Sequence, residues 1–168
     1  MDAELRTALL GEVDDWVRGL PAYQQALIAD MLSGRDVADV ALMWLSSAGP
    51  RDTAPFGGIR AAANSFYDKL LTEVHKLFCS SSDYQDERAQ LIAKARMGQA
   101  VIIVEVSQAI APHVGAASVL IGPAVALTLA VVGRAGTETA CETLSQMLRQ
   151  RAEAEAGGPQ NPPPAPPS

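Results

Sequence analysis

The stretch VGAASVLIGPAVALTLAVV, residues 114–132, decides how this chain folds, because none of its residues carries a formal charge. The uncharged window extends beyond it, since Glu105 is the one formal charge between Arg96 and Arg134. A helix made from residues 114–132 is about as long as the hydrocarbon layer of a bilayer is thick. The fold therefore depends on whether this helix faces lipid, the core of the protein or a partner.

The composition of the stretch makes it a marginal membrane span. Its mean hydropathy of about 2 would mark it as transmembrane in a sliding-window search. It is nevertheless rich in alanine and glycine, and Pro123 leaves one backbone carbonyl without its helical partner. No Trp or Tyr flanks it as an interface anchor. Length favours spanning and composition weakens it, so both a membrane location and a buried core location stay open.

Small residues recur at every fourth position of this helix: Ser118, Gly122, Ala126 and Ala130. Such a ridge lets two helix backbones approach closely, in membranes and in soluble bundles alike. The alternative is that an alanine-rich core helix produces the spacing by chance. We predict a helix-packing ridge, which does not depend on what surrounds the helix.

The preceding apolar segment pairs with this helix in an expected helical hairpin over residues 98–133. Residues 100–112 are too few to span a bilayer, and Pro112 and His113 are placed at the hairpin turn. Glu105 would then be either a buried polar group, which marks a pore or a partner, or a solvated residue of a soluble bundle. The solvated alternative is favoured.

Helical periodicity predicts an all-α fold throughout. Residues 1–47 read as a module of three short helices, the first of them running from Leu5 to Leu20. A breaker-rich linker over 48–58 separates them from a helical unit over 59–156 that contains the apolar hairpin, and the Pro-rich tail 157–168 is expected to be disordered.

Composition excludes several classes of function. The net charge of −6 comes with scattered Lys and Arg, which argues against a nucleic-acid partner. The acidic N-terminus is unlike a cleaved signal peptide, and an intracellular chain, membrane-associated or cytoplasmic, would keep Cys79 and Cys141 reduced.

His75 and Cys79 are four residues apart and would need Cys141 or His113 to complete a metal site. Catalytic and phosphate-binding motifs are absent from the sequence, so we expect neither an enzyme nor a cofactor.

Two functions remain. The first is a non-enzymatic helical protein that associates with membrane, with itself as a homo-oligomer, or with both through the hairpin, while residues 1–47 receive a protein partner. The second is a soluble helical-bundle adaptor with 114–133 as its buried central helix. In layout only, the chain resembles small bacterial membrane-acting effectors, and its Ala-, Gly-, Pro- and Arg-rich composition is compatible with a GC-rich bacterial source.

Overall fold

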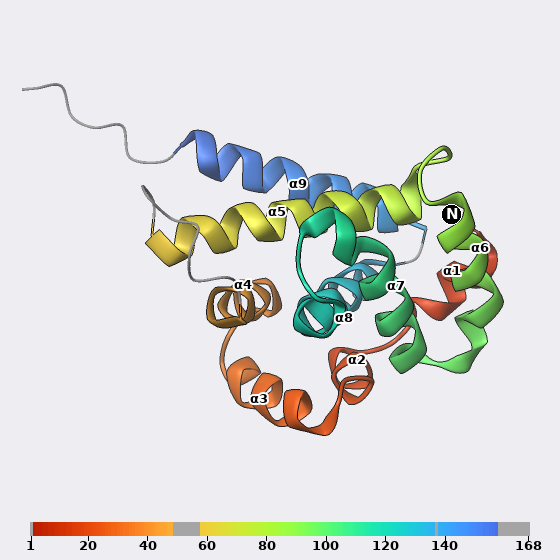
Figure 1. Cartoon of the computed structure of the whole chain (residues 1–168), viewed down its shortest axis with the longest axis horizontal. Helices are drawn as coiled ribbons and strands as arrows, with labels where there is room; N and C mark the ends of the chain where they lie inside the picture. Colours follow the sequence, from red (N-terminus) through yellow and green to blue (C-terminus); the bar gives the residue numbers. More distant parts are fainter. Residues whose placement is uncertain (1, 49–57, 137, 158–168) are drawn as a thin grey trace, which may run out of the picture.

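The computed structural model confirms the all-α prediction for the residues it describes, which are 2–48, 58–136 and 138–157 (Figure 1). In these residues nine α-helices and one 3-10 helix follow one another without a strand. They are α1 (Ala3–Ala8), α2 (Val13–Arg18), α3 (Ala22–Leu32), α4 (Val37–Ala48), α5 (Gly58–Cys79), α6 (Gln85–Lys94), η1 (Ala95–Met97), α7 (Gln99–Val114), α8 (Ser118–Ala135) and α9 (Ala140–Ala156).

The apolar helix α8 lies at the centre of the bundle. Helices α2, α4, α7 and α9 contact it, and α5 in turn contacts α4, α7 and α9 (Figure 1). Every residue from Ile121 to Ala130 is buried. By length and mean hydropathy, 1.8, α8 is the one helix in the described residues that could cross a membrane, and 67% of it is buried inside the protein. Its apolar surface is therefore covered mainly by the chain's own helices.

The N-terminal segment contains four helices, because the first predicted helix is divided in two. Gly11, with a φ of +155°, interrupts the periodic pattern between α1 and α2. The backbone N–H of Glu12 then donates to the Asp15 carboxylate at 3.0 Å, which gives α2 its own start. The apolar spacing across the break was correct, since Leu5, Leu9 and Trp16 are all buried.

One hydrophobic core contains residues from both sides of the predicted linker. Val40 and Leu45 of the N-terminal segment belong to the same buried cluster as Leu70 and Leu127. Residues 49–57 of the linker and residues 158–168 of the Pro-rich tail lie outside the described residues. The N-terminal helices and the apolar hairpin thus stabilise each other by burying a common surface.

The hairpin turn lies after the predicted position. Pro112 and His113 form the last turn of α7, and the chain reverses at Gly115, whose φ of +77° is a conformation that glycine adopts readily. Pro112 removes the helical hydrogen bond to the Gln108 carbonyl. Because Gln108 is exposed, water can pair with that carbonyl and the helix continues.

The two cysteines form a disulfide, which corrects the expectation that both would be reduced. Cys79 is the last residue of α5 and Cys141 lies in the first turn of α9, with their Cα atoms 5.7 Å apart. Further along this helix pair, the Arg151 guanidinium pairs with the Asp68 carboxylate and lies 4.8 Å from the centre of the Tyr67 ring. Helices α5 and α9 are therefore joined at two separate levels.

A candidate binding cleft beside the central helix

Pro123 creates an unpaired carbonyl in α8, and Gln24 of α3 supplies its missing donor. Proline has no N–H, so the Val119 carbonyl four residues earlier loses its helical partner. The Gln24 side chain is 2% exposed, and its Nε2 donates to that carbonyl at 2.9 Å. The same Nε2 lies 3.2 Å from the Tyr23 hydroxyl.

The next carbonyl of α8 also has a side-chain donor from the N-terminal helices. Trp44 Nε1 of α4 donates to the Leu120 carbonyl at 2.7 Å. Two donors from different helices thus bind adjacent carbonyls at the proline. Pro123 fits this bundle because α3 replaces the one hydrogen bond that the proline removes, and α4 adds a donor at the next carbonyl.

We expect Gln24→Met to lower the free energy of unfolding by about 1 to 3 kcal/mol, because methionine keeps the volume and removes the donor from a buried carbonyl. Chemical denaturation followed by circular dichroism measures this difference. Gln150→Met is the matched control, since Gln150 is exposed on α9 and its replacement should change stability by less than about 0.5 kcal/mol. Equal effects of the two substitutions would contradict a specific role for Gln24.

A cleft of about 150 Å³ lies beside the first turns of α8, on the side of α7. Its walls come from the connection between α2 and α3, from Gln24 of α3, from α7 and from the first turns of α8. The lining is mainly apolar, with Gln24, Ser107 and Ser118 as its polar side chains, and no residue lining it carries a formal charge. The apolar side chains in the lining are Leu20, Pro21, Ile103, Val104 and Val119.

The inner wall of the cleft contains a buried hydroxyl without a partner. Ser107 is 2% exposed, and its Oγ makes no hydrogen bond within the described residues. Across from it, Gly122 has no side chain, and a Cβ added there would be 4.0 Å from Ser107 Oγ and 3.9 Å from Ile103 Cγ2. These are ordinary contact distances, so the neighbouring helix would accommodate a methyl group at position 122.

The residues of the small-residue ridge are distributed between the cleft and the core. Ser118 is half-buried and lines the cleft together with Gly122. Ala126 and Ala130 are fully buried further along α8. At Gly122 the ridge faces α7, the other helix of the hairpin. A role in close helix packing remains our proposal for the buried part of this ridge, Ala126 and Ala130, since Gly122 leaves room toward α7.

Glu105 lies outside the cleft and has a charged partner. Its carboxylate accepts a hydrogen bond from Lys94 Nζ of α6 at 2.6 Å. The Glu105 side chain is 17% exposed and that of Lys94 is 42% exposed, so the pair lies at the edge of the bundle. Glu105 is more buried than a fully solvated residue and joins α7 to α6.

The residues considered for a metal site are used in other contacts. Cys79 is bonded to Cys141, so its sulfur is not a free thiolate. His75 Nε2 lies 3.0 Å from the Ser145 hydroxyl, and the His113 ring meets the Tyr84 ring edge-on with centroids 5.2 Å apart. No group of three candidate metal ligands occurs among the described residues.

A small polar cluster holds the turn after α5 in place. The Glu73 carboxylate accepts hydrogen bonds from the Tyr84 hydroxyl at 2.6 Å and from Lys76 Nζ at 2.8 Å. Burial of Glu73 opposes its ionisation, but these two donors outweigh burial and lower the pKa of Glu73. Burial, and then the hydrogen bond to Glu73, raises the pKa of the Tyr84 phenol. The cluster therefore stays as a carboxylate and a neutral phenol near neutral pH.

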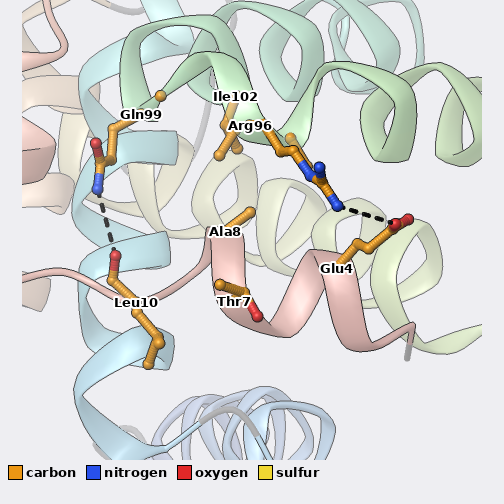
Figure 2. Close-up of a pocket in the computed structure, with 9 residues that line it drawn as sticks. Glu4, Thr7, Ala8, Leu10, Arg96, Gln99 and Ile102 are labelled. Carbon is orange, nitrogen blue, oxygen red and sulfur yellow. Dashed lines mark hydrogen bonds and ion pairs between the residues drawn. The ribbon is translucent and has the colours of Figure 1, made fainter.

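A second hollow, of about 270 Å³, lies between α1 and the start of α7 (Figure 2). Glu4 and Arg96 meet across it at 3.9 Å, and their side chains are 56% and 90% exposed. Exposed pairs of this kind contribute little binding energy. Gln99 Nε2 donates to the Leu10 carbonyl at its other end, at 3.3 Å. This hollow is an open surface groove with water-exposed charges.

A group of large exposed apolar side chains lies on α3, α7 and α8, the helices that contribute to the cleft. Its members are at least 42% exposed although they are large and hydrophobic, and we call them the α3–α8 face: Tyr23, Leu27, Val104, Val119 and Leu120. Val104 and Val119 line the cleft, and the Tyr23 hydroxyl accepts a hydrogen bond from Gln24, which also lines it. Leu27 follows Tyr23 by one helical turn on α3. The sequence alone did not reveal this face, because it combines α3 with the hairpin of α7 and α8, which lies about 70 residues or more further along the chain.

No protein-family model, curated protein or solved structure matches this chain.

Proposed function

We propose that this protein is a non-enzymatic helical bundle that works by association, and that a second copy of the chain binds its α3–α8 face. The observation that carries the proposal is the group of five exposed apolar side chains on α3, α7 and α8, two of which, Val104 and Val119, line the cleft. Exposed apolar patches of this kind are typical of interaction sites. In this proposal α8 is the buried central helix and no cofactor takes part.

The charge distribution favours a second copy as the occupant. A symmetric dimer places the same surface on both sides of its interface, so a charged surface would repel itself. The chain has a net charge of −6, yet the cleft lining carries no formal charge and the five side chains of the α3–α8 face are apolar. Two copies can therefore meet at these five side chains without placing like charges among them.

The covering of α8 supports association at a surface over insertion in a membrane. Insertion of α8 would break the hydrogen bonds that Gln24 and Trp44 donate to the Val119 and Leu120 carbonyls of α8. It would also expose the core residues that now contact α8, at a cost in hydrophobic free energy.

The disulfide further supports residence in an oxidising compartment, in place of the reducing one that we expected from the sequence.

Leu27→Lys is expected to abolish self-association, because it adds like charges to both sides of a symmetric interface. Leu27 is 53% exposed and does not line the cleft, so its replacement leaves the fold intact. Met97→Lys is the matched control, since Met97 is 68% exposed and is not part of the α3–α8 face. Sedimentation velocity over a concentration series should show a weak dimer for the wild type and for Met97→Lys.

Three results would overturn this proposal. The first is a wild type that remains a monomer at the highest concentration. The second is equal dimerisation of both lysine variants. The third is a protein that requires detergent for its extraction. The last result would support membrane association through the apolar hairpin. A small interface of five side chains predicts dissociation in the micromolar range or weaker, which fixes the concentrations to be examined.

A further inference from the structure

We propose that the cleft beside the first turns of α8 is a binding site for a small neutral molecule that is mainly apolar and carries one hydroxyl group. The inference goes beyond self-association, because all residues of this site belong to one chain. It rests on the shape of the cleft, on the unpaired Ser107 hydroxyl and on the absence of charge from the lining.

Gly122 is the residue that keeps the cleft open. A glycine inside a helix is less favourable than alanine, so its presence usually has a local reason. At Gly122 one such reason is local, because a side chain on a helical residue is crowded by the ring of a following proline, here Pro123. The nearest atoms of the other helices would be 3.9 Å or more from an added Cβ, so the lack of a side chain also leaves space in the lining of the cleft.

Ser107 defines the polar end of the proposed ligand. Its Oγ is buried and has no partner in the described residues, which is an uncommon state for a buried hydroxyl. It lies 4.0 Å from the point that a Cβ on Gly122 would occupy, at the inner end of the same space. A ligand hydroxyl there would supply the missing hydrogen bond, since a serine hydroxyl both donates and accepts.

The remaining walls set the size and charge of the ligand. Apolar side chains such as Leu20, Ile103 and Val119 form most of the lining. A charged ligand would lose its hydration without gaining an ionic partner, so a neutral one is required. The volume of about 150 Å³ is close to that of an engineered cavity in another protein that holds benzene. A single aromatic ring with a short alcohol substituent matches both limits.

Benzyl alcohol and ethylbenzene form a matched pair of probes, because they have nearly the same shape and differ in the hydroxyl group. We expect benzyl alcohol to bind more tightly than ethylbenzene by about fivefold, from one added hydrogen bond. Two-dimensional NMR titration of the full chain should show both probes shifting amide signals of residues 19–24, 103–107 and 118–122.

Two variants separate the contributions of the space and the hydroxyl. Gly122→Ala should lower the affinity for both probes by about fivefold or more, because its methyl group occupies part of the cleft. Ser107→Ala should remove the preference for benzyl alcohol and leave ethylbenzene binding unchanged. Circular dichroism of each variant verifies that the fold is retained.

The same titrations on Leu27→Lys distinguish this inference from self-association, since Leu27 does not line the cleft. Binding to that variant supports the ligand site even where no dimer forms. Shifts that occur elsewhere in the chain, equal affinity for both probes, or unchanged binding by Gly122→Ala would overturn the ligand site while leaving self-association untouched.

Discussion

Replacing Gly133 by alanine is expected to lower the free energy of unfolding by about 3 kcal/mol. A Cβ at position 133 would overlap the backbone carbonyl oxygen of Leu9, because the end of α8 lies directly against the connection between α1 and α2. A backbone carbonyl cannot rotate away as a side chain can. Alanine would therefore force the whole segment to move.

The segment next to Gly133 has little freedom to move. Leu9 is 1% exposed, and on its other side Gln99 Nε2 donates to the Leu10 carbonyl. Gly11 follows with a φ of +155°, and a Cβ there would lie 3.1 Å from the same Gln99 nitrogen. Displacing Leu9 would thus disturb a core side chain, a hydrogen bond and a turn together.

Gly122→Ala is the matched control, since both glycines are buried in the same helix. An alanine at 122 meets the other helices at ordinary contact distances, and its gain in helix propensity is opposed by crowding against the ring of Pro123, so it should change the free energy of unfolding by less than about 1 kcal/mol. Thermal and urea unfolding of both variants measures the contrast with Gly133→Ala. A similar loss of stability in both variants would contradict a specific role for the approach of Leu9 at Gly133.

The sequence was sufficient to predict the all-α class and the exceptional position of residues 114–132. A helix that is apolar on all sides must be covered, and helical spacing at Leu5, Leu9 and Trp16 predicted residues that prove to be buried. The unpaired carbonyl at Pro123 was also predictable from the chemistry of proline. These features depend on local rules that act within one or two turns of helix.

The features that sequence reasoning missed depend on contacts between distant segments. The first helix is divided at Gly11, where the φ of +155° and the bond from Glu12 to Asp15 start a second helix although the apolar spacing continues. The disulfide requires that α9 return along α5, which periodicity alone does not establish. Gln24 looked like an ordinary polar residue of a helix, and its role appears only when α3 reaches the Val119 carbonyl. The binding cleft is likewise formed by helices whose relative placement no local pattern specifies.

Removing the disulfide by the double substitution Cys79→Ser and Cys141→Ser is expected to lower the free energy of unfolding by about 4 kcal/mol. The two cysteines are 62 residues apart, so the bond closes a long loop that contains α6, α7 and α8. Closing such a loop reduces the conformational entropy of the unfolded chain, and the stabilisation grows slowly with loop length.

The comparison with a reducing agent separates the bond from the substitutions. Urea unfolding of the wild type should move to lower midpoints in the presence of a phosphine reductant, whereas the double serine variant should show no response. An intact-mass measurement with thiol alkylation, before and after reduction, establishes that the bond is present in the starting protein. Alkylation of both cysteines in the unreduced, denatured protein would instead show free thiols.

Because α5 and α9 are also joined through Arg151 and Asp68, we expect the reduced protein to stay helical and folded in the absence of urea. The disulfide then adds stability to a bundle that its own core already specifies.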